Sequence, residues 1–407
     1  MRPVTGSVAC GIRPRRSPWT FFDPSVFRPS LFRMDVAQRS PLIGLQCALS
    51  IAAPLVVGIL AGHSRVGGWG AVGAFFTDMA MFQPGHRFRA RIVAGTGLLV
   101  AIGGFLGAAC GIRSVAIYPV VAVWTLGAGL LVAVSPQAAL IGVSSATALV
   151  YAASLDVSVG MAAELGVVMA LSGLATAGLS LAVVQVVGVA RRRRSIPNRG
   201  ARAAVARPAA APAPVPPPTT APAPASPAPP SPPTGLAWLR QVAATACRVV
   251  RERSPSLWYA ARLAVTAVVG TVLYRVIDPA DGFWIPEAAL FVMRPDRRTT
   301  ERRAVLRVVG SVAGAALTTG LLVALSPGPV LLAALAVGAS AIAFSVQRVN
   351  FGLYITFVTC IFVLLTAFGG LPERAVVVDR VVDNVVGSVL ALAALWLWPV
   401  RARPRGR

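Results

Sequence analysis

Twelve apolar stretches, most of them long enough to cross a lipid bilayer, dominate this sequence and decide its fold class. A transmembrane helix needs roughly 20 apolar residues. Six stretches precede residue 190 and six follow residue 256, at about 42–61, 67–83, 92–111, 115–134, 137–154, 161–189, 257–277, 283–294, 304–325, 329–346, 351–369 and 376–398. We therefore predict an all-α polytopic membrane protein with about 12 transmembrane helices.

The composition supports a membrane location and narrows the chemistry. Of the 407 residues, 56% are hydrophobic and 13% are charged, against about 25% charged in an ordinary soluble domain. All 38 basic residues are arginine, which excludes a phosphate-binding P-loop and a Schiff-base lysine. The five cysteines are widely spaced and only two histidines occur. We expect no metal, no other cofactor and no enzymatic activity.

A sharp change of composition divides the chain into two membrane units. Residues 190–235 begin with four consecutive arginines and contain a run with 13 prolines in 26 positions. Such a segment cannot bury a core and predicts an extended tether. It separates a first six-helix unit, residues 42–189, from a second, residues 257–400. Residues 1–41 form a basic tail, in which Met34 is a candidate alternative start.

An amphipathic stretch, residues 236–256, joins the tether to the second unit. Trp238, Val242 and Val249 recur at helical spacing, and most of the arginines fall elsewhere on the helical wheel. This pattern predicts a basic helix that lies on the anionic inner leaflet of the bilayer. A frayed extension of the following span is the alternative.

The distribution of arginine predicts the orientation of the chain. If both termini are cytoplasmic, 33 of the 38 arginines lie in or beside inner segments, including a basic tail at residues 401–407. The outer side then holds Arg65, Arg113, Arg275, Arg374 and Arg380. This bias is that of the positive-inside rule, so we expect a multi-pass protein of the plasma (inner) membrane. Because the arginines lie between apolar runs, nucleic acid is not an expected partner.

The two units carry matching landmarks. Trp69 and Trp284 each begin a span that is followed by an arginine-rich loop. Gly95 follows Trp69 at the same sequence distance at which Gly310 follows Trp284, so both landmarks share one offset between the units. Because six spans bring the chain back to the same side, we expect two parallel repeats about an axis along the membrane normal.

Small residues mark the span that follows each arginine loop. Gly310 and Gly314 form a GxxxG motif, and Gly103 and Gly107 continue a similar spacing in the first unit. Such spacing lets helices approach closely. We interpret it as helix packing, with a smooth pore-lining face as the alternative.

Charged residues within the predicted spans are the candidates for chemistry, because a charge inside a bilayer is costly. Asp78 lies within the second span, and Glu287 follows Pro286, which deprives its helix of one hydrogen bond. Both carboxyl groups are candidates for a proton or substrate relay. Asp379 and Asp383 share a helix face and are further candidates; pairing with a neighbouring arginine that only anchors the span is the alternative.

The arginine loop before the ninth span offers a candidate anion site. Arg303 and Arg307 lie one helical turn apart where the chain re-enters the membrane. They are placed to capture an anionic substrate at the cytoplasmic mouth. Ordinary topology anchoring with contacts to lipid phosphate is the alternative.

The second unit resembles the fusaric-acid-resistance-like (FUSC) family, which is grouped with aromatic acid exporters. The resemblance depends on Phe283-Trp284, on Arg303-x-x-x-Arg307-x-x-Gly310-Ser311-x-x-Gly314, and on Arg380-Val-Val-Asp383-Asn384-Val-Val-Gly387. Residues 42–189 resemble the family more weakly. The resemblance implies an integral membrane protein that moves organic anions outward, and a chain that is similar to two fused single-unit relatives.

We therefore expect an exporter of small organic anions in a bilayer with an anionic inner leaflet. A passive anion channel and a non-transporting membrane scaffold are the rival functions. The sequence leaves open whether two copies associate as a homo-oligomer.

Overall fold

The computed structural model describes residues 34–82, 89–155, 157–194, 236–277, 283–369 and 373–398, and within these residues it is helical with no strand. The first unit contains α1 (Pro41–Leu60), α2 (Ser64–Asp78), α3 (Arg89–Cys110), α4 (Ile117–Leu130), α5 (Pro136–Ala153) and α6 (Val159–Arg194), with short 3-10 turns at Val36–Gln38, Met79–Phe82 and Leu131–Ala133. Helix α8 (Leu236–Arg251) precedes the second unit, which contains α9 (Pro255–Ile277), α10 (Trp284–Val292), α11 (Arg297–Leu325), α12 (Pro329–Val346), α13 (Phe351–Phe368) and α14 (Glu373–Leu397).

A helix occupies each of the twelve predicted stretches, but not every helix has the length of a span. Eight are long and apolar enough to cross a membrane, namely α1, α3, α6, α9, α11, α12, α13 and α14. Helices α4 and α5 are apolar and shorter. With nine residues, α10 reaches only about 14 Å at 1.5 Å per residue. Within the described residues the protein is thus all-α, with eight candidate membrane spans.

Local sequence signals explain where several helices begin. Pro41, Pro136 and Pro329 occupy the first helical turn, where the missing N–H costs nothing. Ser135 caps α5 by accepting a hydrogen bond from the Ala138 amide at 3.0 Å. Asn350 caps α13 in the same way. The two side-chain caps are separated along the chain by the same offset as the two tryptophans, Trp69 and Trp284.

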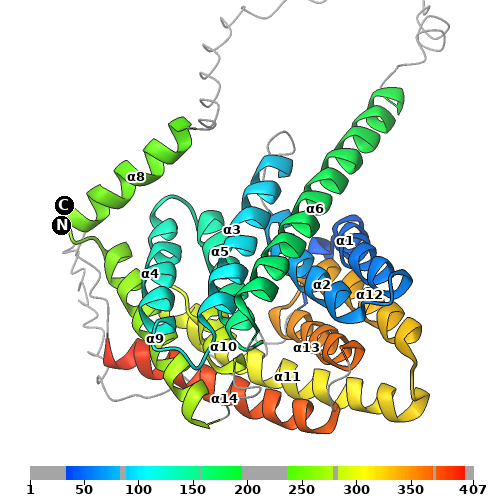
Figure 1. The fold of residues 1–407 in the computed structure, drawn as a ribbon. Coiled ribbons are helices and arrows are strands. Elements are labelled where there is room, and N and C mark those ends of the chain that lie inside the picture. Colours follow the sequence, from blue (N-terminus) through cyan, green and yellow to red (C-terminus); the bar gives the residue numbers. More distant parts are fainter. Residues whose placement is uncertain are drawn as a thin grey trace, which may run out of the picture.

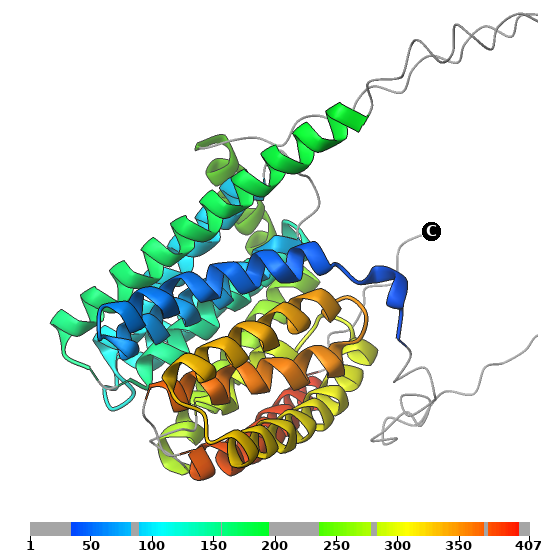
Figure 2. The ribbon, with the colours of Figure 1, turned by 90° about the vertical axis from the view of Figure 1, so that its right-hand side faces the viewer.

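The helices that flank the tether differ from the predicted boundaries. Helix α6 continues through Arg194, so the four arginines extend a helix instead of starting the tether, and it projects from the bundle (Figure 2). Residues 195–235 lie outside the described residues. Helix α8 lies at the margin of the bundle (Figure 1), where it contacts α9 and the turn Leu131–Ala133. It ends at Arg251, and Arg253 adopts a positive φ of 45° before α9 begins. Helix α8 is therefore a separate helix and not a frayed extension of α9.

Glycines allow close helix packing in both units. A Cβ atom on Gly107 of α3 would collide with the Leu149 carbonyl oxygen of α5, and one on Gly314 of α11 would collide with the Thr356 carbonyl oxygen of α13. The sequence separation between the glycine and its partner is the same in the two pairs. These glycines therefore serve helix packing, as the sequence suggested.

The packing partners in the two units correspond. Helix α3 packs against α5 and α6, while α11 packs against α13 and α14. Between the units, α1 packs against α12 and α4 against α9, and in the centre α5 contacts α10 and α2 contacts α13. The second and fifth helices of each unit therefore line the contact between the two units.

Candidate functional site

A buried ion pair joins α10 to α11 inside the second unit. The Nη2 of Arg307 donates to the Oε2 carboxylate oxygen of Glu287, and both side chains are almost fully buried. The Nε of Arg307 donates to Oδ1 of Asn384 at 2.7 Å, which brings α14 into the network. Asn384 in turn donates to the backbone carbonyl of Arg380 at 2.6 Å. Buried charges need pairing and hydrogen bonds, and this network supplies both to Arg307 and Glu287.

Arg380 lies beside this network and is held in a different way. Its guanidinium carbon lies 3.5 Å from the centroid of the Trp284 ring and 5.1 Å from that of Phe362. The residue is 1% exposed, and its Nε and Nη1 have no hydrogen-bond partner within the described part of the chain. Stacking on the two rings and the nearby carboxylates of Glu287 and Asp383 offset part of the cost of burying this cation.

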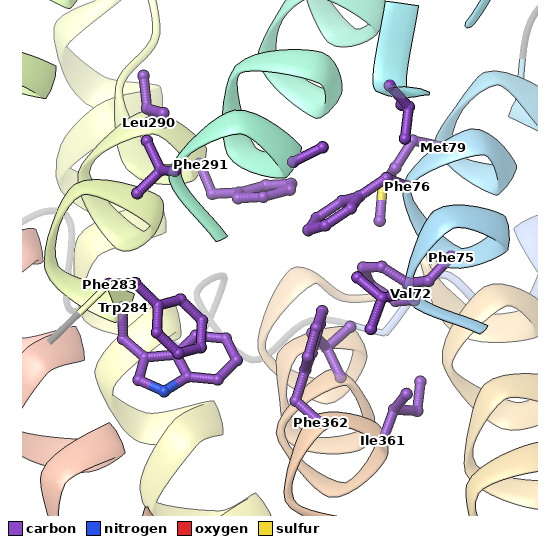
Figure 3. Close-up of a cluster of buried hydrophobic side chains, with 14 of the residues drawn as sticks. Val72, Phe75, Phe76, Met79, Phe283, Trp284, Leu290, Phe291, Ile361 and Phe362 are labelled. Atoms are coloured by element: carbon purple, nitrogen blue, oxygen red, sulfur yellow. The ribbon is translucent and has the colours of Figure 1, made fainter. Parts of the chain in front are cut away.

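Aromatic side chains fill the contact between the two units where α2, α5, α10 and α13 meet (Figure 3). This aromatic cluster consists of Phe75, Phe76, Tyr151, Phe283, Trp284 and Phe362. The ring centroids of Trp284 and Phe362 are 5.0 Å apart, and those of Phe362 and Phe75 are 4.9 Å apart. Each edge-to-face pair of this kind contributes about 0.5–1.5 kcal/mol of stabilisation beyond the burial of its area. The cluster therefore stabilises the packed contact between the two units. Arg380 borders it through Trp284.

Asp78 lies at the end of α2 in the first unit and is completely buried. One carboxylate oxygen accepts a hydrogen bond of 2.5 Å from the Ser50 hydroxyl, which also donates to the carbonyl of Cys47. The other oxygen has no hydrogen-bond partner among the described residues. No ion pair to Asp78 occurs within the described ranges. Asp78 is therefore a buried carboxyl group that can carry a proton.

The loop between α10 and α11 is an ordered structure in which several charges are already bound. Asp296 caps α11 by accepting hydrogen bonds from the backbone and the hydroxyl of Thr299, and these bonds lower the pKa of its carboxyl group. Glu301 is buried and pairs with Arg297 at 2.7 Å. Burial lowers the pKa of the Arg294 guanidinium.

Arg303 and Arg307, which the sequence predicts at the cytoplasmic mouth, have different surroundings. Arg303 is half-buried, lies 4.6 Å from the centroid of the Phe351 ring, and donates to the carbonyl of Phe291 at 3.3 Å. Arg307 lies one turn deeper and is paired with Glu287. The pair thus does not form an open two-arginine clamp, because each side chain already has contacts of its own.

A hollow of about 410 Å³ lies at the opposite end of the bundle from the loop between α10 and α11. Trp69, Arg65 and Glu164 line it together with the turn between α1 and α2. It gives access to the first residues of α2, whose further turns carry Phe75 and Phe76 of the aromatic cluster.

The structure brings together only part of the predicted candidate set. Glu287 and Arg307 are in direct contact, and Asp383 is buried beside them. Asp379 is half-buried on the same helix as Asp383. Asp78 and Arg303 lie elsewhere, each with separate partners.

Sequence reasoning missed Arg380 as a site residue and placed it on the outer side. The structure places its side chain in the interior, on Trp284. The signal was present, since Arg380 is one turn before Asn384 in a long apolar helix. What could not be read from the sequence is that α14 packs on α10, which supplies the tryptophan.

The eight long apolar helices and the buried charged network define a multi-pass helical membrane protein. Residues 253–394 match the family described as fusaric acid resistance protein-like, so this part of the chain is similar to that family. The family resemblance of the second unit is thereby confirmed.

Curated relatives match over segments of comparable length. The chain is 29% identical over 140 residues to the uncharacterized protein slr1298 of Synechocystis sp., which covers 34% of this chain and 18% of that protein. It is 27% identical over 173 residues to the inner membrane protein YccS of Escherichia coli, covering 41% and 23%. An uncharacterized protein of Neisseria gonorrhoeae is 24% identical over 142 residues, covering 35% and 34%. The matched segments thus span only a minor part of each of these relatives. No solved structure matches the chain significantly.

Proposed function

We propose that this protein is a membrane transporter that exports small organic anions of the aromatic carboxylate type. The observation that carries the proposal is Arg380, a buried guanidinium with two nitrogens unpartnered among the described residues, next to an aromatic cluster at the contact of the two units. A guanidinium binds carboxylates, and the rings offer an apolar surface to a planar ligand.

The two units are parallel repeats around this contact. Two observations support the repeat. The sequence distance from Trp69 to Trp284 equals that between the helix caps Ser135 and Asn350, and the helices of the two units make corresponding contacts. A repeat of this kind places the substrate path at the interface between the units. The aromatic cluster fills that interface here, so transport requires its rings to separate.

Asp78 and Glu287 are two of the four candidate carboxyl groups for energy coupling, and their surroundings favour Asp78. Glu287 is neutralised by Arg307, and removal of its charge would leave a buried cation unpaired. The hydrogen-bond partners of the Asp78 carboxylate among the described residues are the neutral side chains of Ser50 and Cys47, so Asp78 can gain and lose a proton without breaking an ion pair. We assign proton coupling to Asp78 and a positioning role to Glu287.

The arginine distribution gives the orientation of the proposed exporter. Cytoplasmic termini place the loop between α10 and α11 inside, and the hollow beside Trp69 outside. Helix α8 is amphipathic and basic, and it rests on the anionic inner leaflet of the plasma (inner) membrane.

The test is efflux from proteoliposomes of labelled aromatic and aliphatic carboxylates, with and without an imposed pH gradient. A proton-coupled exporter moves aromatic carboxylates faster with the gradient, and Asp78→Asn abolishes that difference. A passive anion channel conducts equally in both conditions and in the variant. No movement of any carboxylate by a correctly inserted protein would contradict the proposal and favour a membrane scaffold.

A further inference from the structure

We propose that Arg380 and Trp284 form a carboxylate-binding subsite that exists once per chain, in the second unit only. The inference rests on the proposed function, because it identifies the residues and the number of sites through which an organic anion is bound.

The first step is the geometry of Arg380. Its Nε and Nη1 are buried and have no hydrogen-bond partner within the ranges that the structure describes. The N–H groups of Nε and Nη1 lie on opposite edges of the guanidinium plane, so each can donate one charge-assisted hydrogen bond to an oxygen of a ligand carboxylate. The Trp284 ring holds that plane by stacking at 3.5 Å. A fixed, buried cation with unsatisfied donors favours a carboxylate as its ligand.

The second step is the neighbourhood of the subsite. Trp284 and Phe362 both contact the Arg380 guanidinium and both belong to the aromatic cluster. The Nε1 of Trp284 has no hydrogen-bond partner among the described residues either, so it can donate to a ligand oxygen. Once the rings of the aromatic cluster separate, a carboxylate bound to Arg380 places its attached ring against Phe362 at the contact between the units.

The third step is that the contact of α2 with α6 aligns with the contact of α10 with α14. Gly70 of α2 faces Ser172 of α6, where a Cβ atom would lie 3.0 Å from the Ser172 hydroxyl oxygen. When the sequence distance from Trp69 to Trp284 is added to Gly70 and Ser172, the corresponding positions are Ile285 of α10 and Gly387 of α14. These two residues also face each other. The two interfaces have the same register, so positions in these helices that are separated by this offset occupy corresponding places.

This alignment shows that the first unit keeps the tryptophan but lacks the charged side chains of the subsite. Trp69 corresponds to Trp284, and Leu165 corresponds to Arg380. In the same register, the places of Glu287 and Asn384 are taken by apolar residues of the first unit, namely Val72 and Met169. Leu165, Val72 and Met169 are buried in the core. A second copy of the subsite is thus absent from the corresponding place in the first unit.

The charges around Arg380 keep the subsite available. Glu287 and Asp383 are the carboxylates that act on its charge, and Arg307 is the nearby cation. The guanidinium of Arg307 is bonded to Glu287 and Asn384. Glu287 and Asp383 therefore compensate part of the charge of Arg380, while its Nε and Nη1 keep no hydrogen-bond partner among the described residues.

Isothermal titration of the full-length chain in lipid nanodiscs tests the subsite, with benzoate as the probe. We expect one benzoate per chain. Benzamide, with the same ring and no charge, and acetate, with the same charge and no ring, should each bind at least about tenfold more weakly. Two sites per chain, equal binding of benzamide, or no benzoate binding to the wild type would overturn the proposal.

Two variants with matched controls locate the site. Arg380→Lys keeps the charge and removes the Nε and Nη1 donors and the planar guanidinium that stacks on Trp284, so benzoate affinity should fall at least about tenfold. Trp284→Phe leaves every charge in place and should also weaken binding. Leu165→Met and Trp69→Phe change the corresponding positions of the first unit and should leave the affinity unchanged. Unaltered affinity in Arg380→Lys or Trp284→Phe, with wild-type thermal stability, would overturn the subsite.

The outcome separates the subsite from the proposed function. Carboxylate efflux that persists at wild-type rate and KM in Arg380→Lys rejects the subsite and keeps the transporter. Stoichiometric benzoate binding that depends on Arg380, in a protein that moves no carboxylate through liposomes, rejects the transporter and keeps the subsite.

Discussion

Glu287 and Arg307 form a buried ion pair between α10 and α11, although each lies in a helix that reads as largely apolar. Neither charge would be stable alone at this depth, because the cost of burying an unpaired ion is several kcal/mol. The pair fixes the short helix α10, and with it Trp284 and Phe283, against the longer α11.

The first prediction concerns this ion pair. Glu287→Gln should lower the free energy of unfolding by about 3–5 kcal/mol, because it leaves a buried guanidinium unpaired. The matched control is Arg297→Gln, which breaks a pair whose arginine is half exposed and should cost less than about 1 kcal/mol. Thermal unfolding in detergent measures both. Equal effects of the two variants would contradict the account.

The second prediction concerns Asp78. Asp78→Asn keeps the size of the side chain and its contact with Ser50, and it removes the proton-carrying group. We expect folded protein whose carboxylate flux no longer responds to a pH gradient. Ser50→Ala removes the hydroxyl donor and retains the carboxyl group, so gradient dependence should persist. Gradient-driven flux at wild-type level in Asp78→Asn would remove Asp78 from the coupling mechanism.

The third prediction concerns the glycines of α11. A Cβ at Gly314 meets the Thr356 carbonyl oxygen, whereas at Gly320 no heavy atom lies within 4 Å. Gly314→Ala should therefore destabilise the protein by about 1–3 kcal/mol through overpacking. Gly320→Ala should be neutral or stabilising by up to about 1 kcal/mol, since alanine favours the helix. Similar destabilisation by both substitutions would show that α11 and α13 pack differently.

The fourth prediction is a pH dependence at the start of α11. The pKa of Asp296 is lowered in the folded protein by hydrogen bonds from Thr299. A lowered folded pKa means that the charged cap contributes stability above the ordinary carboxyl pKa, and that this contribution is lost as the pH falls through the lowered value. Asp296→Ala should cost about 0.5–2 kcal/mol at pH 7 and less at pH 3. A cost that grows on acidification would contradict this assignment.

Much of the fold follows from the sequence. Apolar length located the twelve α-helices of the two units, and Pro41, Pro255 and Pro329 begin their helices close to the predicted starts. The number of helices long enough to span a membrane could not be predicted from the sequence, which indicated about 12 where the described residues contain eight. The ends of α10 depend on Pro295 and on packing against α9 and α14, which a hydropathy pattern does not contain.

The candidate site was predictable only in part. Charges in apolar stretches singled out Asp78 and Glu287, because burial of a charge is costly and therefore informative. Which charges meet is a property of tertiary packing. Arg307 was read as a mouth residue because it follows a basic loop, and its pairing with Glu287 needs α10 and α11 to lie side by side.

The most direct test of the central claim, that anions pass between the two units, is a cross-link through the aromatic cluster. Cysteines replace Phe75 and Phe362, whose rings contact across the units, in a background without the five native cysteines. A cleavable bifunctional thiol reagent then joins them in proteoliposomes. We expect carboxylate efflux in the unlinked variant, loss of efflux on linking, and recovery on cleavage. Efflux that continues through the fully linked protein would contradict the claim.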